Sequence, residues 1–313
     1  MITLRRIIFV ILSLVAGAVF LYSAYTKLYP IQTFEYTIVE YVHLPWELAA
    51  ITARFLIGLE AGLGSLLILN LYGKKKWVLT ASFSLLLIFS AYLIYLWATA
   101  GNNINCGCFG DAIWMSPSAS LLKNIGLLII LAILLRYHRG LVFRRSNILA
   151  LCLLFAAFAS VFIAFYIPSE QPNWLRKDKY KMDFSPLYQV ENADLPAVDL
   201  TKGKHIVAFL SQSCPHCRLA AYKMHLMKVQ DTTLSFFMII GGTSDLSDFW
   251  KTTKAQNIPY TRLDKDTFLK YTGGIFPLIV LVNNGWVEAK TDYVTLDQAE
   301  LEHWVAQKSD TLK

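Results

Sequence analysis

The sequence predicts a membrane bundle of five α-helices over residues 1–168, a tether over 169–195 and an α/β domain over 196–313. Of the 313 residues, 55% are hydrophobic and only 16% are charged, whereas an ordinary soluble domain has about a quarter charged residues. Long apolar stretches fill the first half, and short strand-like and helix-like patterns alternate in the second. This composition excludes a single soluble domain, a disordered chain and a fibrous repeat.

A helix that spans a bilayer needs about 20 mainly apolar residues. Five stretches meet this requirement: Ile7–Tyr25, Trp46–Leu71, Trp77–Trp97, Ala119–Leu135 and Ile148–Ile167. Tryptophan and tyrosine at their borders are typical of membrane interfaces, which favours spans over buried core helices. The first stretch lacks a clear small-x-small cleavage site, so we expect an uncleaved helix rather than a signal peptide.

The basic residues of the first half predict its orientation. Up to Pro168 there are 12 Lys and Arg against 5 Asp and Glu, whereas the rest of the chain has 17 of each. Nine of the 12 lie before the first span, after the second or around the turn after the fourth: Arg5, Arg6, Lys74, Lys75, Lys76, Arg136, Arg139, Arg144 and Arg145. The positive-inside rule then places the N-terminus in the cytoplasm and the C-terminal domain on the periplasmic side of a bacterial inner membrane. The second half has no basic stripe with interleaved aromatic residues, so we expect no nucleic-acid partner.

Charged residues inside the spans are costly and are therefore functional candidates. Arg54 and Glu60 lie in the second span and are candidates for cofactor binding; the alternative is a polar contact that holds the bundle together. Their spacing places them about 120° apart around the helix, so we expect no direct pair. Lys27 and Glu47, near the outer ends of the first two spans, are expected to pair or to extend to the interface. Cys152 is expected to be a small buried side chain.

The second half predicts a compact α/β sandwich. We expect strands at His205–Leu210 and Leu234–Ile240, helices at Cys214–Val229, Ser247–Asn257 and Leu296–Gln307, and a hairpin of Leu278–Val282 and Trp286–Ala289. The hairpin turn is Asn283-Asn284-Gly285, because Asn-Gly is a strong turn signal.

Two cysteines follow the first of these strands, in Ser213-Cys214-Pro215-His216-Cys217. Cysteines separated by two residues at a helix start can form and break a disulfide with little backbone movement. The helix N-terminus favours a thiolate and His216 adds a positive charge when protonated, so Cys214 is the expected nucleophile and Cys217 the resolving thiol. Half of a zinc site and a structural disulfide are the alternatives; zinc would need two further ligands.

Together with Gly273-Gly274-Ile275-Phe276-Pro277 before a strand, this motif resembles the thioredoxin superfamily over about residues 195–310. The resemblance implies a thioredoxin-like fold and a cis-proline at Pro277 that lies against the active-site cysteines and guides substrate. The Pro-His dipeptide resembles that of DsbA, a periplasmic disulfide donor. The chain departs from thioredoxins at Ala208, where they bury an aspartate, and this leaves the proton acceptor for Cys217 unidentified.

A second cysteine pair, Cys106 and Cys108, lies in the outer loop between the third and fourth spans, within Asn105-Cys106-Gly107-Cys108-Phe109-Gly110-Asp111. A disulfide across a single residue closes a small ring, and departures from relaxed geometry ease its reduction. Such a pair suits electron transfer or transient mixed disulfides, and the glycines allow a tight turn and the close approach of a partner. Copper(I) binding and a static disulfide are the alternatives.

The first half also resembles a known family. The segment Ser23-Ala24-Tyr25-Thr26-Lys27-Leu28, Glu60 in the second span and the Cys-Gly-Cys-Phe-Gly motif resemble the MauE/DoxX family of redox-associated membrane proteins over about residues 5–138. MauE belongs to methylamine utilisation and is implicated in maturing the disulfide-rich small subunit of methylamine dehydrogenase.

These observations predict a membrane-anchored thiol–disulfide oxidoreductase that exchanges disulfides with exported proteins through Cys214 and Cys217. We expect Cys106 and Cys108 to exchange with that pair, in the oxidative direction, with a quinone in the bundle as electron acceptor, no covalently bound cofactor and no metal. One alternative is a reductase or isomerase in cytochrome or methylamine dehydrogenase maturation. A non-enzymatic alternative is a membrane assembly factor or a copper-binding protein.

Overall fold

The computed structural model describes residues 2–110, 112–141, 145–165, 179–188 and 198–307. The chain divides into two compact units, Met1–Ile167 and Pro168–Lys313. Most of the expected tether lies outside the described residues. Within that range, however, Met182, Phe184 and Leu187 are buried in the core of the second unit, so this stretch is part of the folded domain.

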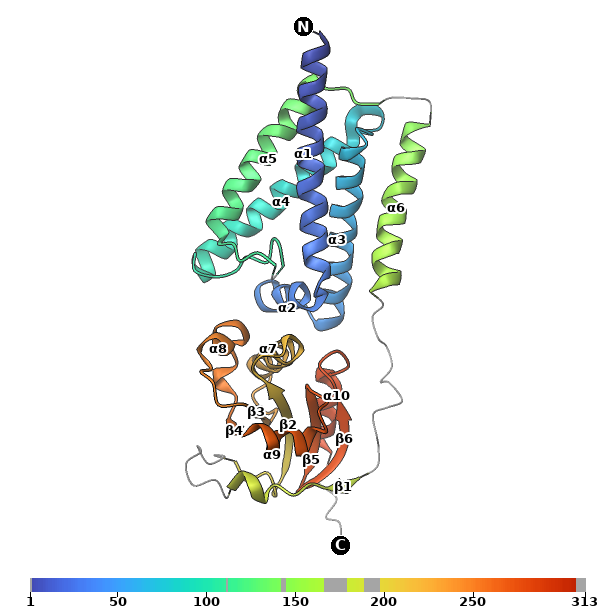
Figure 1. Cartoon of the computed structure of the whole chain (residues 1–313). Helices are drawn as coiled ribbons and strands as arrows, with labels where there is room; N and C mark the ends of the chain where they lie inside the picture. The colour runs from blue at the N-terminus through green and yellow to red at the C-terminus, as the bar shows by residue number, and fades with distance from the viewer. Residues whose placement is uncertain (1, 111, 142–144, 166–178, 189–197, 308–313) are drawn as a thin grey trace. The chain divides into compact units, whose positions relative to one another are not determined.

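Helices form the first unit (Figure 1). They are α1 (Ile2–Leu28), α2 (Ile31–Val42), α3 (Trp46–Ile68), α4 (Trp77–Ala100), α5 (Pro117–Tyr137) and α6 (Ser146–Ala164), with a 3-10 turn at Lys74–Lys76 before α4. Five segments, which comprise α1, α3, α4 with the preceding turn, α5 and α6, are long and apolar enough to cross a membrane, which confirms the five expected spans. The short helix α2 was not expected, because its 12 residues are too few for a span.

Glycines bring the helices of the first unit into close contact. A Cβ atom on Gly17 of α1 would lie 2.7 Å from the carbonyl oxygen of Gly64 in α3, so these two backbones touch. A Cβ atom on Gly62 of α3 would lie 2.4 Å from Leu154 in α6. Small residues are what allow such approach between helices in a bilayer.

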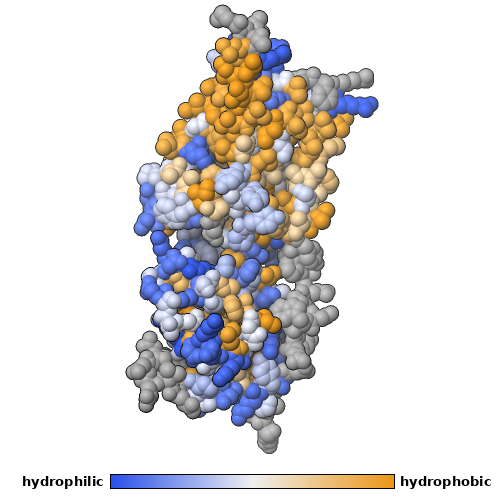
Figure 2. All heavy atoms as spheres, in the orientation of Figure 1, coloured by the Kyte–Doolittle hydropathy of each residue, from blue (hydrophilic) through white to orange (hydrophobic). Residues whose placement is uncertain are grey.

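The expectation of a buried Cys152 was wrong. Cys152 is exposed on α6, because α6 contacts the bundle through the face that packs against α3 and leaves its other faces open. In a bilayer those faces meet lipid, so the apolar surroundings of this thiol come from outside the protein. The surface of the first unit is largely apolar in Figure 2, whereas that of the second unit mixes polar and apolar residues.

As we expected, Arg54 and Glu60 do not form an ion pair; Glu60 pairs with Lys27 instead. The Nη1 atom of Arg54 lies 2.5 Å from Oε1 of Glu35 in α2, and its Nε atom donates to the carbonyl oxygen of Phe165 at 2.6 Å. Arg54 therefore ties α2 and the end of α6 to α3, which matches the alternative of a polar contact that holds the bundle together.

The second unit contains a mixed sheet with the strand order β1-β6-β5-β2-β3-β4. Its strands are β1 (Tyr180–Lys181), β2 (Lys204–Ser211), β3 (Phe236–Gly241), β4 (Tyr260–Leu263), β5 (Leu278–Asn283) and β6 (Trp286–Thr291). Strands β2, β3 and β4 are parallel, and β5 runs antiparallel to both β2 and β6. The α-helices are α7 (Pro215–Gln230), α8 (Ser247–Thr253), α9 (Lys265–Thr272) and α10 (Gln298–Ala306).

This topology is the thioredoxin-like fold that the sequence predicts. Strand β2 is the apolar centre of the sheet: its six inner residues are all buried, and it pairs with β3 on one side and β5 on the other. Strand β1, strand β4 and helix α9 were not expected, because each is short and only weakly patterned. Since α7 directly follows the end of β2, the Cys-Pro-His-Cys motif lies at the edge of the sheet where parallel strands end.

Candidate functional site

Cys214 is the N-cap residue of α7, and Pro215 is the first residue of the helix. Proline fits this position because its missing N–H would have no intrahelical partner there. The sulfur of Cys214 accepts a hydrogen bond from the backbone N–H of Cys217 at 3.4 Å. Cys214 is half-buried, whereas Cys217 is 0% exposed. A partner thiol can therefore reach Cys214 first, which fits the predicted roles of nucleophile and resolving thiol.

Burial raises the pKa of the Cys217 thiol well above its usual range, and the backbone at Ser211 offsets this only in part. Ala208 in β2 occupies the position at which thioredoxins bury an aspartate, and it is fully buried. Burial thus favours the protonated form of the Cys217 thiol.

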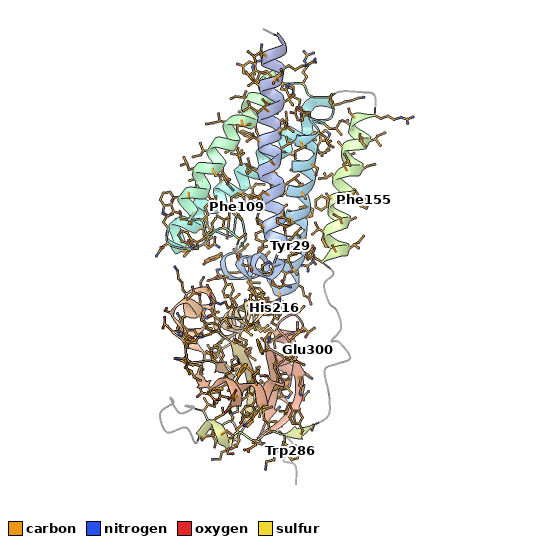
Figure 3. The ribbon with its side chains drawn as sticks, in the orientation of Figure 1. Tyr29, Phe109, Phe155, His216, Trp286 and Glu300 are labelled. Atoms are coloured by element: carbon orange, nitrogen blue, oxygen red, sulfur yellow. The ribbon has the colours of Figure 1, made fainter. Side chains whose placement is uncertain are left out.

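His216 is exposed at the start of α7 (Figure 3) and has a partner that sequence spacing did not suggest. Its Nδ1 atom lies 2.9 Å from the hydroxyl oxygen of Tyr293, and the two rings stack with centroids 5.5 Å apart. Tyr293 comes from the loop between β6 and α10, where Lys223 of α7 donates to its carbonyl oxygen at 2.9 Å. The pKa of Tyr293 is raised by burial and by the negative charges of Asp292 and Cys214.

The peptide bond between Phe276 and Pro277 is cis, as the thioredoxin resemblance implies. The preceding Gly273 and Gly274 both have positive φ angles, of 60° and 81°, a conformation that glycine adopts without strain. Ile275 is 73% exposed between them and the proline. The loop therefore presents an apolar side chain to solvent next to Pro277.

The second cysteine pair lies in the loop between α4 and α5, which packs against the ends of other helices. Gly107 has a φ of 70°, and a Cβ atom there would lie 3.3 Å from Thr37 of α2. A Cβ atom on Gly110 would lie 2.5 Å from the carbonyl oxygen of Thr26 in α1. We expected the two glycines to allow the close approach of a partner protein. In the structure it is α1 and α2 of the same chain that approach them closely.

Both thiols of this loop are free, and they differ in environment. Cys106 is 2% exposed and its sulfur lies 2.9 Å from the hydroxyl oxygen of Ser120 in α5, whereas Cys108 is half-buried. The hydrogen bond from Cys106, which is the largest cause, and the positive charges of Lys123 and Lys27 together lower the pKa of Cys108 to about 6, although burial opposes this shift. The same hydrogen bond, together with burial, raises the pKa of Cys106. The two shifts favour a thiolate at Cys108 and a protonated thiol at Cys106.

A buried ion pair lies directly behind Cys108. Lys27 of α1 contacts both carboxylate oxygens of Glu60 in α3, at 2.7 and 2.8 Å, and both side chains are almost fully buried. The hydroxyl of Ser23 lies 2.9 Å from the carbonyl oxygen of Cys108 and 3.3 Å from Oε1 of Glu60. Lys27 was expected to pair with Glu47 or to extend to the interface, and it does neither: it turns inward to Glu60, whereas Glu47 is exposed in the first turn of α3.

The structure thus brings Cys214, Cys217 and His216 together in one site, and Cys106, Cys108, Lys27 and Glu60 in another. Sequence reasoning missed Tyr293, Ser23, Ser120 and Lys123, which join these sites from other elements. Of these, Ser23 belongs to the family motif of the first span, and Ser120 and Lys123 lie in the fourth predicted span, but no signal in the sequence joins them to the cysteines. No group of three or more His, Cys, Asp and Glu that could hold a metal ion is found among the described residues.

The first unit has five apolar spans, and the second has a thioredoxin-like fold with a Cys-Pro-His-Cys motif. Together they define a membrane-anchored thioredoxin-fold protein. Residues 5–137 match the family described as Methylamine utilisation protein MauE. The N-terminal part of the chain is therefore a MauE membrane domain, as the motifs in α1, α3 and the loop before α5 indicate.

A curated relative is Protein TlpB of Flavobacterium psychrophilum, which is 36% identical over 112 residues, or 34% of this chain and 30% of the relative. The match thus spans less than a third of that protein. Three solved structures are similar to a third of the chain. MTB DsbF is 16% identical, with 33% of this chain and 78% of that chain covered and a TM-score of 0.28.

Two further similar structures have TM-scores of 0.27. A secreted Mycobacterium tuberculosis disulfide oxidoreductase homologous to E. coli DsbE is 19% identical, with 33% of this chain and 81% of that chain covered. The thioredoxin domain of a thiol-disulfide oxidoreductase from Bacteroides vulgatus is 22% identical, with 34% of this chain and 82% of that chain covered.

Proposed function

We propose that the protein is a membrane-anchored thiol–disulfide oxidoreductase whose second unit exchanges disulfides with exported proteins. The geometry of Cys214 and Cys217 carries this proposal. Cys214 lies at a helix N-terminus with its sulfur half-buried and bonded to a backbone N–H, and a fully buried thiol follows three residues later. Helix N-termini are where reactive cysteines are activated, since the exposed N–H groups stabilise negative charge.

We propose further that Cys106 and Cys108 receive the electrons that the second unit takes from its substrates. In this step the reduced Cys214 attacks the disulfide between Cys106 and Cys108, and Cys217 then resolves the mixed disulfide, so that the disulfide of the second unit re-forms and both loop cysteines are released as thiols. The lowered pKa of Cys108 makes it a good leaving group in this exchange. The overall direction is then oxidative: substrate thiols lose electrons, and the loop pair passes them on.

The distribution of basic residues supports a periplasmic location for both cysteine pairs. Arg5 near the start of α1 lies over the ring of Tyr137 at the end of α5, and Lys76 before α4 donates to the carbonyl oxygen of Leu135 in α5. These basic residues therefore share one end of the bundle, which the positive-inside rule assigns to the cytoplasm. Helix α2 lies at the opposite end, where α1 ends and α3 begins (Figure 1), and there the loop of Cys106 and Cys108 packs against it through Thr37.

Trapping of mixed disulfides tests the exchange step. A Cys217→Ser variant cannot resolve a disulfide formed on Cys214, so it should accumulate cysteine-linked adducts with exported proteins, visible on non-reducing gels. Cys214→Ser is the matched control, because it keeps the buried thiol and removes the accessible one. Equal adduct formation in both variants would contradict the proposal.

The proposed relay has its own test in whole cells. Thiol labelling of the wild type should find Cys214 and Cys217 mainly oxidised, whereas a Cys106→Ser variant should accumulate them in the reduced form. Cys152→Ser removes a cysteine from the same unit without touching the loop, and it should behave as the wild type. An unchanged redox state in Cys106→Ser would reject the relay while leaving exchange at Cys214 in place.

A further inference from the structure

A cavity of about 210 Å³ lies beside the loop of Cys106 and Cys108, within the first unit. Its walls come from α1, α2, α3 and α4, and both cysteines line it together with Gly107. We propose that this cavity binds the ring of a membrane quinone and that Cys106 and Cys108 reduce it there. The inference rests on the proposed function, in which these two thiols hold electrons from the second unit.

The size and opening of the cavity fit a lipid-soluble ring. A cavity of about 150 Å³ lined by aliphatic and aromatic side chains accepts benzene, so the space here accommodates a six-membered ring with substituents. Val42 and Ile88 line it and are 47% and 63% exposed on the apolar outside of the bundle. A ligand that travels in the bilayer can therefore enter from the side, with its tail left in lipid.

One polar group in the wall has no hydrogen-bond partner among the residues that the structure describes. Tyr92 of α4 lines the cavity and packs against the cluster that contains Cys106 and Cys108. Its hydroxyl oxygen is buried, and no hydrogen bond reaches it from the described residues. A buried hydroxyl without a partner is costly, and a carbonyl oxygen of a quinone would accept a hydrogen bond from it. A plain acyl chain offers no such acceptor.

The remaining walls suit a planar acceptor of electrons. Phe34 and Phe89 line the cavity, and aromatic rings pack well against a flat conjugated ring. Lys27 also lines it, with its Nζ atom 5.0 and 5.1 Å from the centres of these two rings. Lys27 rather than Glu60 lines the cavity, so the positive end of their ion pair faces a bound ring and favours the arrival of electrons on it.

The reaction balances without a further oxidant or reductant. The S–H bond of Cys106 breaks, Cys108 reacts as the thiolate after its proton has gone to water, and one S–S bond forms between the two sulfurs, so that the second proton of the hydroquinone is taken from water. The two electrons and two protons convert the quinone to the hydroquinone, which leaves through the same opening. Each turnover thus makes one disulfide in the loop and one hydroquinone in the bilayer.

Direct binding and single-turnover reduction test this inference on the full-length protein in quinone-free lipid nanodiscs. Ubiquinone-1 is the probe, and its binding is measured by equilibrium titration with the thiols oxidised. The protein is then reduced with dithiothreitol, desalted and mixed with the probe without oxygen. We expect saturable binding of one ubiquinone-1 per chain, and loss of the Cys106 and Cys108 thiols, by mass spectrometry, in step with hydroquinone formation.

Two tyrosines on α4 provide a matched pair of variants. Tyr92→Phe removes only the unpartnered hydroxyl and should weaken binding about fivefold, the effect of losing one neutral hydrogen bond. Tyr95→Phe makes the same change one turn away, at a residue that is 50% exposed on the bundle surface, and should bind as the wild type does. A Cys106→Ser variant should bind the probe and fail to reduce it.

Three results would overturn the inference: no saturable binding to the wild type, equal binding by Tyr92→Phe and Tyr95→Phe, or equal displacement of the probe by dodecanol in wild type and Tyr92→Phe. The third result would mark the cavity as a site for lipid chains. Exchange at Cys214 is measured separately, with a dithiol peptide and glutathione disulfide as oxidant. Exchange without quinone binding would overturn the quinone site alone, and quinone reduction without exchange would overturn the proposed function.

Discussion

Removal of one partner of the buried ion pair behind Cys108 should destabilise the membrane unit strongly. Lys27 and Glu60 contact each other through both carboxylate oxygens, at 2.7 and 2.8 Å, with side chains only 3% and 4% exposed. Glu60→Gln or Lys27→Met leaves the other charge buried without its counterion. We expect each single variant to lower the free energy of unfolding by about 3–5 kcal/mol, because an uncompensated charge in an apolar interior is costly.

The double variant should behave differently from the sum of the two. Lys27→Met with Glu60→Gln removes both charges, so the desolvation cost disappears along with the attraction. Replacement of a buried pair by uncharged groups is often close to neutral, so we expect a loss of about 2 kcal/mol or less. The coupling energy of the cycle is then at least about 4 kcal/mol, well above the usual error of additivity.

The assay is reversible unfolding of the detergent-solubilised protein, followed by tryptophan fluorescence in increasing denaturant. Glu47→Gln is the matched control: it makes the same chemical change on the same helix, at an exposed residue, and should alter stability by less than about 0.5 kcal/mol. Losses that simply add in the double variant would refute the reasoning, since they would mean that the two side chains stabilise the bundle independently.

Three further outcomes are expected. Because the pKa of Cys108 is lowered to about 6, its labelling by methyl methanethiosulfonate should be slow below that pH and fast above it. The Cys106→Ala variant lacks the hydrogen-bond donor, so the midpoint of the labelling rate against pH should move toward the ordinary thiol pKa of 9.0. Gly17→Ala should lower the free energy of unfolding by about 1–3 kcal/mol, because its Cβ would lie 2.7 Å from a backbone oxygen. Gly126→Ala has open space around the new methyl group and should stabilise α5 slightly. Thermal melting of both variants tests this. Tyr293→Phe frees the ring of His216, so the rate of disulfide exchange should fall about fivefold at an unchanged melting temperature, and an unchanged rate would show that the contact is incidental.

The five spans and the start of α7 could be predicted because each leaves a local signal. Length and hydropathy identify a span without any knowledge of its neighbours, and two cysteines on either side of Pro-His announce a helix start and a dithiol. The sheet core was predictable for the same reason, since β2 and β3 are continuous apolar runs. Strand β4 and helix α9 are short and amphipathic, so tertiary packing rather than local pattern decides them.

The side chains around each dithiol could not be predicted, because no local pattern joins them. Tyr293 lies 77 residues from His216, and Lys27 lies 33 residues from Glu60. Their pairing depends on how the sheet edge and the helices pack. The sequence suggested a pair of Lys27 with Glu47 because both lie near the same end of the bundle. In the structure Lys27 pairs with Glu60 instead, because a lysine that points into the interior requires a buried counterion.

The loop of Cys106 and Cys108 is attached to the bundle through its backbone. Ser23 reaches the carbonyl oxygen of Cys108 at 2.9 Å, and Cys106 is tied through its own N–H to the carbonyl oxygen of Met115 at 3.0 Å. Because neither attachment uses a sulfur, the thiols can change covalent partner while the main chain that carries them stays in place. The two cysteines can therefore alternate between the dithiol and the disulfide while the loop backbone and the helices of the membrane unit keep their positions.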